Sequence, residues 1–230
     1  MKSWLIIGCL FGQTAFGEWI KPPTKSAKGY LVPSPDYQPN FPNDHGAHRG
    51  YGLEWWYWIG HLKEVDGERE FGFQSTVFRV AGEPRESLGF SNHSFGKQHL
   101  YLTHSALTDL AADSYLHHER VVREGWQAKV SPNSLHMKVA GIEAQLSADG
   151  KGHRLLTQYP NAGKLELALV PLKPLVRFGD RGLSRKGDAP ASVSWYWTYT
   201  RLEAEGIISH KDEEIRVKGM AWMDHEISSS

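Results

Sequence analysis

The chain has 230 residues, of which 40% are hydrophobic and 23% are charged, as is usual for a globular protein with a substantial core. Lys and Arg together number 26, as do Asp and Glu, so the formal net charge is zero. Because there is no surplus of positive charge to release counterions from a phosphate backbone, we expect no nucleic-acid partner.

The N-terminus has the pattern of an export signal peptide over residues 1–17. Lys2 forms a short basic region, residues 4–12 are apolar, and Ala15 and Gly17 provide a small-residue cleavage site. The apolar run is too short to span a bilayer as a stop-transfer helix. We therefore predict an exported protein, periplasmic or secreted. A buried N-terminal strand and a lipoprotein anchor at Cys9 are the alternatives.

Cys9 is the only cysteine of the chain, and cleavage after Gly17 would remove it. The mature protein is then expected to contain no disulfide, no thiol nucleophile and no thiolate metal ligand. Residues 18–43 come next and are rich in proline, which excludes a helix or a central strand there. We predict an extended arm that runs across the surface and contains Pro22, Pro23, Pro33, Pro35, Pro39 and Pro42.

From Glu54 onward the sequence predicts short β-strands separated by turn residues. Leu165, Leu167 and Leu169 alternate with other residues, as expected for a strand with one buried face. No window gives an apolar helical stripe longer than two turns, and many short strands indicate a sandwich or barrel. The predicted strands are residues 55–62, 69–80, 98–109, 134–146, 153–158, 163–170, 192–204 and 214–222, with a long irregular loop at 171–190.

Tryptophan is concentrated in a few of these strands. Clustered Trp on strands is explained either by a well-packed core or by the wall of a pocket for a large apolar or unsaturated ligand. Alternation predicts that Trp195 and Trp197 share one face and that Tyr196 points to the other. The pocket interpretation gives five candidate ligand-binding residues: Trp55, Trp56, Trp195, Trp197 and Trp222.

Three proton-transferring side chains follow the last aromatic strand: Asp224, His225 and Glu226. A carboxylate beside Trp and Met loses hydration, which favours its protonated form, and Asp224 is the candidate proton donor to an alkene or enol. His225 is the candidate for orienting it and Glu226 for the paired base. Because strand neighbours point to opposite faces, Asp224 and Glu226 can enter one pocket, but Asp224 and His225 can do so together only if the strand has bulged or ended. A strand-end Asp that ties down a turn is the alternative.

A second polar group precedes the first aromatic strand and contains Asp44, His45, His48 and Glu54. His-x-x-His with nearby carboxylates suits zinc or iron, but Pro42 and Gly46 place the motif in a loop without a helical His pair. We therefore predict no metal. His45, His48 and Glu54 are candidate ligand-binding residues, with backbone capping by the loop side chains as the alternative. Glu54 precedes Trp55 and needs a partner such as an arginine if it is buried.

Five segments, in this order, resemble the AttH/CrtC-like family, whose best-known enzyme is hydroxyneurosporene synthase, or carotenoid 1,2-hydratase. They are FPNDHGAHRGYGLEWWYWIGHL, YLTHSALTD, LKPLVRFGDRGLSRKG, SWYWTYTRLEAEG and VKGMAWMDHEISSS. The resemblance covers residues 41–230. The common serine hydrolases, kinases and dehydrogenases are disfavoured, because their motifs are absent from the sequence.

The resemblance implies an all-β, lipocalin-like barrel or strongly curved sheet over residues 44–230, enclosing an apolar cavity. It also implies that Asp224 protonates the alkene and that Trp222, Trp195 and Trp197 line the site. The hydratase branch has a histidine near Trp195, so this chain departs from it there. Family members continue past the Asp-His-Glu motif into a second lipocalin-like half, so the chain is expected to represent the first half.

Three functions follow as hypotheses. The first is a hydratase, isomerase or cyclase that acts on an isoprenoid or polyene without a cofactor. The second is a non-catalytic carrier of a lipid or other hydrophobic molecule, associated with an ABC transporter and lying near a membrane. The third is a secreted, metal-dependent hydrolase that uses His45, His48, His225 and Glu226. Cofactor-free hydration is the preferred hypothesis.

Overall fold

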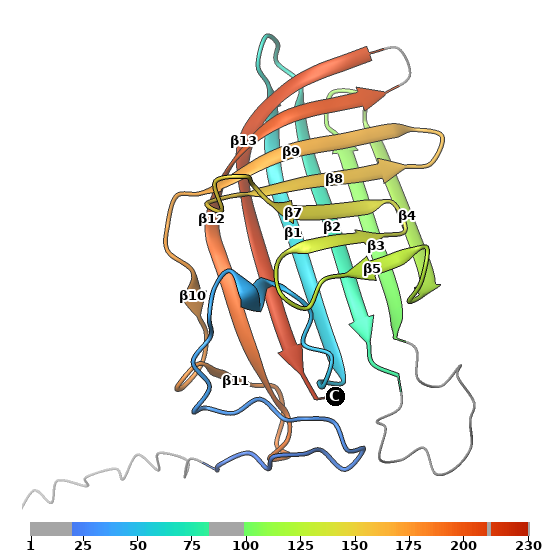
Figure 1. The fold of residues 1–230 in the computed structure, drawn as a ribbon. Coiled ribbons are helices and arrows are strands. Elements are labelled where there is room, and N and C mark those ends of the chain that lie inside the picture. Colours follow the sequence, from blue (N-terminus) through green and yellow to red (C-terminus); the bar gives the residue numbers. More distant parts are fainter. Residues whose placement is uncertain (1–19, 83–98, 211–212, 230) are drawn as a thin grey trace, which may run out of the picture.

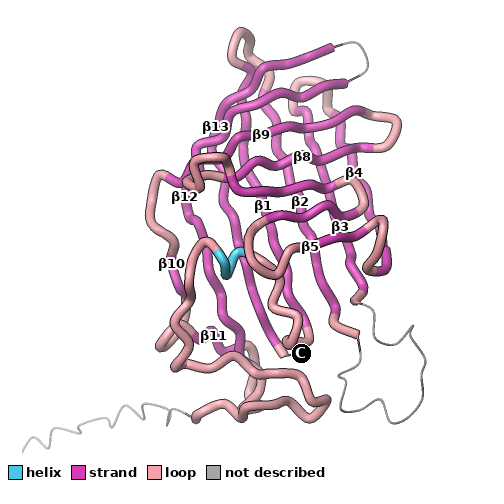
Figure 2. The backbone as a smooth tube through the Cα atoms, viewed as in Figure 1, coloured by secondary structure: helices cyan, strands magenta, loops and turns pink. Residues whose placement is uncertain are grey.

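The computed structural model describes residues 20–82, 99–210 and 213–229, so the predicted signal peptide lies outside the described residues. The described chain forms thirteen strands and one short 3₁₀ helix, η1 (Asn43–His45) (Figures 1 and 2). The strands are β1 (Leu53–Glu64), β2 (Glu70–Val80), β3 (Leu100–Asp109), β4 (Ser114–Arg123), β5 (Ala128–Val130), β6 (His136–Val139), β7 (Ile142–Leu146), β8 (His153–Tyr159), β9 (Gly163–Pro171), β10 (Val176–Arg177), β11 (Leu183–Arg185), β12 (Val193–His210) and β13 (Glu213–Ser228).

All thirteen strands belong to one antiparallel sheet with the order β4-β3-β2-β1-β13-β12-β9-β8-β7-β6-β5. The short strands β10 and β11 pair with the first half of β12. A register shift between Tyr199 and Leu202 lets the two halves of β12 run in different directions. Figure 1 shows β5–β9 crossing in front of β1–β4. The sheet is therefore a nearly closed barrel, which confirms the predicted all-β, lipocalin-like class.

The strands differ from their predicted limits in several places. Strand β12 continues to His210, beyond the predicted end at residue 204, β5 was not predicted, and the predicted irregular loop 171–190 contains β10 and β11. Strand β13 continues to Ser228, because its pairing with β1 runs through to Leu53, so Asp224, His225 and Glu226 lie inside a strand. The predicted strand 134–146 is split into β6 and β7 by a turn at Ala140 and Gly141, which both have positive φ. Strand β4 was not predicted, because it is largely exposed and has no buried apolar face.

The inner faces of the two sheet halves pack on each other and fill the barrel. The three leucines of β9 are buried and their neighbours are exposed, as the alternation predicts. The hydroxyl groups of Ser75 on β2 and Thr157 on β8 lie 2.6 Å apart, so the facing halves are in direct contact. Buried Trp56, Trp58 and Tyr101 belong to the same core. The described residues therefore enclose a packed core.

One end of the barrel is closed by the proline-rich arm, which begins at Ile20 in the described chain (Figure 1). Tyr37 stacks on Trp195 with ring centroids 4.3 Å apart, and the Trp195 Nε1–H donates to the carbonyl of Ser34 at 2.9 Å. Phe41 meets Trp197 edge-on at 5.3 Å. The two tryptophans therefore lie beneath the arm.

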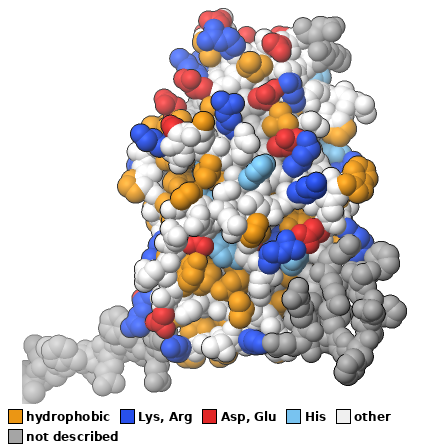
Figure 3. All heavy atoms as spheres, viewed as in Figure 1, with side chains coloured by type: hydrophobic (Ala, Val, Ile, Leu, Met, Phe, Trp, Pro, Cys, Tyr) orange, Lys and Arg blue, Asp and Glu red, His pale blue; other side chains and the backbone are white. Residues whose placement is uncertain are grey.

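Charged groups of both signs are intermixed on the face formed by β5–β9, as Figure 3 shows, in keeping with a net charge of zero. A shallow pocket of about 550 Å³ lies on the outside of β6–β9 and of β12. Its lining includes Leu156 and Ile207 together with Arg154, Glu166 and Glu205, and it contains none of the predicted site residues. Within the described residues, no helix is both long and apolar enough to cross a bilayer.

Candidate functional site

The two polar and aromatic motifs, which are far apart in the sequence, lie side by side because β1 pairs with β13 and β13 with β12. Trp56 pairs with His225, and His225 pairs in turn with Trp197. Paired residues point to the same face of an antiparallel sheet, so these three side chains share the inner face. The next residues along the strands, such as Asp224, point outward.

This register corrects the expectation that Asp224 shares a cavity with Trp195 and Trp197. Asp224 pairs with Tyr57 and Thr198, whose side chains are on the outer face, whereas the two tryptophans are on the inner face. Asp224 and Glu226 share a face and His225 points to the other, in agreement with the alternation argument. The predicted site residues therefore form two groups, one on each side of the sheet, rather than one pocket.

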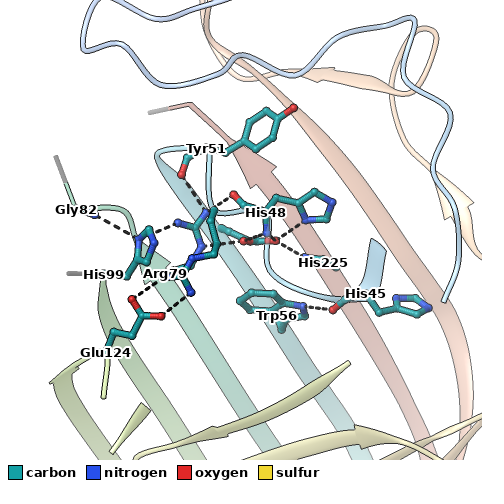
Figure 4. Close-up of polar contacts among 11 residues, drawn as sticks. His45, His48, Tyr51, Trp56, Arg79, Gly82, His99, Glu124 and His225 are labelled. Carbon is teal, nitrogen blue, oxygen red and sulfur yellow. Dashed lines mark hydrogen bonds and ion pairs between the residues drawn. The ribbon is translucent and has the colours of Figure 1, made fainter. Parts of the chain in front are cut away.

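The inner group is centred on Glu54, which is completely buried. It is surrounded by His48, Arg79 and His225, which are labelled in Figure 4. Its Oε1 lies 2.9 Å from His48 Nδ1 and 2.9 Å from His225 Nε2, and its Oε2 accepts a hydrogen bond from Arg79 Nε at 2.9 Å. Burial alone would raise the pKa of Glu54, but the hydrogen bonds from His225 and His48 and the charge of Arg79 hold it well below its usual range. Glu54 is therefore a carboxylate with its charge compensated.

His48 lies between two carboxylates. Its Nδ1 faces Glu54, and its Nε2 lies 3.2 Å from Oδ1 of Asp44. Burial lowers the pKa of His48, but the hydrogen bonds and charges of Glu54 and Asp44 outweigh it and raise the pKa above its ordinary value. Asp44 is held in turn by the Tyr37 hydroxyl at 2.7 Å and by the backbone N–H of Asn40. The arm thus contributes directly to the inner group.

Arg79 belongs to the inner group but was not among the predicted site residues. The sequence predicted only that Glu54, if buried, needs a partner such as an arginine. Arg79 is fully buried and donates from its Nη2 to the carbonyl oxygens of His48 and Tyr51 at 2.9 and 3.0 Å. Its Nη1 lies 3.3 Å from Nδ1 of His99, whose pKa is lowered to about 4 by burial and by the nearby charge of Arg79. The signal in the sequence was an arginine inside the apolar strand FGFQSTVFRV.

A second inner cluster lies deeper in the barrel. His45 Nε2 is 3.2 Å from the hydroxyl of Tyr199, and His153 meets both rings edge-on. Burial lowers the pKa of His45 to about 2 and that of His153 to about 4, so both imidazoles are neutral near pH 7. Several buried polar atoms in this region have no hydrogen-bond partner among the described residues: His45 Nδ1, His153 Nδ1, His225 Nδ1, Trp58 Nε1 and Trp197 Nε1.

The aromatic residues of the inner face pack closely around these histidines. Trp56 stacks on His225 at 4.8 Å, and its Nε1–H donates to the carbonyl of His45 at 3.0 Å. Trp195 and Trp197 stack on each other at 5.9 Å, and Trp197 meets His225 edge-on. These three tryptophans are buried, so they hold the histidines in place as part of the core.

The outer group is centred on Asp224, which is only 9% exposed. Its Oδ1 accepts a hydrogen bond from Trp222 Nε1 at 2.6 Å and also contacts the hydroxyl of Thr198. Burial and the charge and hydrogen bond of Asp224 raise the pKa of Tyr196, and Tyr57 is affected in the same direction by burial and by Asp224. A carboxyl group therefore lies among three half-buried aromatic side chains.

The other two predicted site residues of the outer face, Glu226 and Trp55, each contact a neighbouring side chain. Glu226 is buried and lies 2.7 Å from the ammonium group of Lys186, which also lies 4.8 Å from the ring of Tyr196. Trp55 contacts Phe78 on β2, with ring centroids 6.0 Å apart. The loop that contains Lys186 thus covers one side of the outer group.

Comparisons with known proteins agree on the fold. A family model described as AttH-like matches residues 32–230. A solved AttH structure from Nitrosomonas europaea is 31% identical to this chain, with a TM-score of 0.72 over 88% of its length. Kievitone hydratase from Nectria haematococca is similar in fold, with 11% identity and a TM-score of 0.57 over 92% of this chain. This chain spans 58% and 57% of those two solved chains, and no curated protein matches it.

Proposed function

We propose that this chain, which belongs to the AttH-like family, takes part in the hydration of a carbon–carbon double bond in a hydrophobic substrate. The family match over residues 32–230 supports the resemblance on which this hypothesis began. A similar fold is found in an enzyme named as a hydratase, kievitone hydratase, although at 11% identity that likeness concerns the fold. The choice of reaction therefore depends on the chemistry of the described residues.

The observation that carries the proposal is the position of Asp224. Its carboxyl lies just below the outer surface, beside half-buried Trp222, Tyr57 and Tyr196. An apolar substrate that lies on these aromatic rings would bring a double bond to a carboxyl group that is shielded from water. In that position the Asp224 carboxyl would serve as the general acid that transfers a proton to the double bond.

Two hydrogen-bond donors, Thr198 and Trp222, hold the Oδ1 atom of Asp224 in place. The Thr198 hydroxyl carries one hydrogen, yet it lies within reach of two acceptors, the Met223 carbonyl at 2.9 Å and Asp224 Oδ1. Trp222 Nε1 also reaches Oδ1, so Oδ2 receives neither of these two contacts.

The proposed reaction conserves all atoms. Asp224 transfers its proton to one alkene carbon, which leaves a carbocation on the other carbon. The faces of Trp222, Tyr57 and Tyr196 stabilise this cation, and such an interaction is worth about 2 kcal/mol when the groups are desolvated. Water then adds to the cation, and its excess proton returns to the Asp224 carboxylate, so no redox cofactor is consumed.

The packed interior favours this enzyme over the carrier hypothesis. A carrier of the lipocalin kind holds its ligand inside the barrel, but the described barrel is filled by its own side chains, as the Ser75–Thr157 contact illustrates. We therefore place the substrate on the outer face. An isoprenoid or polyene substrate, export, and an association with an ABC transporter or a membrane stay predictions from the sequence.

The test is hydration of an acyclic isoprenoid in ¹⁸O-labelled water, with product analysed by mass spectrometry. Asp224→Asn should lower the rate about 100-fold or more, because loss of a general acid typically costs 10²–10⁴-fold. Asp36→Asn, which changes an exposed carboxylate, is the matched control and should retain the wild-type rate. Circular dichroism checks that both variants are folded. An unchanged rate in Asp224→Asn, or wild-type protein that incorporates no label, would contradict the proposal.

A further inference from the structure

We infer that His48, Glu54 and His225 form a binding site for a divalent transition-metal ion, with Zn²⁺ as the best match. One ligand atom from each residue lies within 4.8 Å of the others. Two imidazoles and one carboxylate are a donor set used by zinc enzymes, which leave a fourth position for water. The inference does not depend on the proposed hydratase, because these residues are on the inner face and Asp224 is on the outer face.

The ligand atoms converge on one small volume. Glu54 Oε1 lies 2.9 Å from both His48 Nδ1 and His225 Nε2. Zinc binds such atoms at about 2.0–2.2 Å, so ligand atoms around a tetrahedral ion are separated by about 3.3 Å. Each of the two Glu54 contacts would therefore open by a few tenths of an ångström, while the two imidazole nitrogens, which lie within 4.8 Å of each other, would move closer together. Strands β1 and β13 hold Glu54 and His225 in place, and only His48 comes from a loop.

The groups behind the ligands have the arrangement expected around a metal. His48 Nε2 faces Asp44 Oδ1 at 3.2 Å, which is the carboxylate–histidine pair that fixes a ligating imidazole. Glu54 Oε2 is held by Arg79, so Oε1 is left to point between the two histidines. Trp56 stacks on the His225 ring at an interplanar angle of 22° and fixes its plane.

The charges of the site also suit an added cation. Asp44 and Glu54 contribute two negative charges and Arg79 one positive charge, so these three groups together attract a cation. Zn²⁺ that replaces the hydrogens between Glu54 and the imidazoles would leave a net charge of about +1, which a bound hydroxide can neutralise. The His48 side chain is 12% exposed while Glu54 is inaccessible, so the ion would enter past His48.

The experiment uses protein that has been stripped with a chelator and then titrated with Zn²⁺ by isothermal calorimetry. We expect one ion per chain, at least 100-fold weaker binding in His225→Ala, and about 10- to 100-fold weaker binding in Asp44→Asn, since outer-shell partners have that effect. His153→Ala removes a histidine that is as deeply buried but outside the site, and should bind like wild type.

Co²⁺ gives a second readout that does not require a variant. Tetrahedral coordination by nitrogen and oxygen would give intense visible absorption, which Zn²⁺ should bleach in a 1:1 ratio. If His225→Ala fails to fold, His48→Gln replaces the ligand in the loop and should also abolish the absorption. Absence of saturable Zn²⁺ binding, or equal affinity in wild type and the ligand variants, would overturn the inference. Absence of hydratase activity would not overturn it, because the proposed hydration takes place at Asp224 on the outer face.

Discussion

At the scale of single residues, the inner face depends on compensation of the buried charge of Glu54. This carboxylate and Arg79 are both inaccessible to solvent and 2.9 Å apart. Taking either charge out of water costs several kcal/mol, and the partner offsets that cost only while both are present. Each charge can therefore be buried in the core only because the opposite charge is beside it.

Glu54→Gln is expected to lower the free energy of unfolding by about 3–5 kcal/mol, because it leaves Arg79 buried without its counter-charge. Urea denaturation followed by fluorescence measures this change. Glu124→Gln is the matched control, because its partner Arg49 has a side chain that is 44% exposed. That surface pair should contribute about 1 kcal/mol or less. Equal losses in the two variants would show that burial does not determine the effect.

His153 makes stability depend on pH. Burial lowers its pKa to about 4 from the ordinary value of 6.5, so the folded protein keeps it neutral where the unfolded chain would protonate it. Between these values the unfolded state binds more protons, and stability therefore falls as the pH falls. From about pH 7.5 to about pH 5, this one group should remove about 2 kcal/mol.

His153→Phe should remove that part of the pH dependence. Urea denaturation at both pH values gives the slope, and His136→Phe, which replaces an exposed histidine on β6, serves as the control. His45 and His99 also have lowered pKa values, so a smaller slope of the same sign should remain. A slope identical to wild type in His153→Phe would contradict the assignment.

At the scale of elements, the close approach of β12 to β9 requires a glycine at position 206. A Cβ added to Gly206 on β12 would lie 1.8 Å from the backbone oxygen of Glu166 on β9. A backbone atom cannot move aside as a flexible side chain can, so only glycine fits at position 206 of β12. Gly72 on β2 is different, because its nearest neighbour would be the Thr108 Cβ at 3.9 Å.

Gly206→Ala should therefore destabilise the protein by about 2 kcal/mol or more through overpacking, whereas Gly72→Ala should be neutral or slightly stabilising. Thermal unfolding monitored by circular dichroism compares the two substitutions, which add the same methyl group to strands of one sheet. If Gly206→Ala leaves the stability unchanged, the two strands can move apart at that point at no cost in free energy.

At the scale of the whole molecule, the arm and the barrel form one unit. Tyr37 covers Trp195 and also donates its hydroxyl hydrogen to Asp44, so it joins the arm to the inner group. Tyr37→Ala should lower the free energy of unfolding by about 2 kcal/mol and make Trp195 more accessible to acrylamide. Tyr37→Phe keeps the stacked ring and should lose only the hydrogen bond, about 1 kcal/mol. Unchanged quenching in Tyr37→Ala would show that the arm does not cover Trp195.

The all-β class and most strands could be predicted from alternation, as for Leu165, Leu167 and Leu169 in β9. Alternation also predicted that Asp224 and His225 face opposite ways. It could not predict which inner residues meet, because pairing of β1 with β13 joins segments more than 150 residues apart, as the contact between Glu54 and His225 shows. Arg79 was missed as the partner of Glu54 for a different reason: it is only 25 residues away, but the register that places it opposite Glu54 in the pairing of β1 with β2 was not predicted.

The amino-acid sequence by itself determined the strand periodicity, the proline-rich arm and the resemblance to the AttH-like family, because these depend on local spacing and residue type. Only the tertiary structure decided that Asp224 lies outside the barrel while His48, Glu54 and His225 meet inside it. The physical reason is strand register: a shift of one residue moves every side chain to the opposite face of a sheet, and register is set by contacts between distant segments.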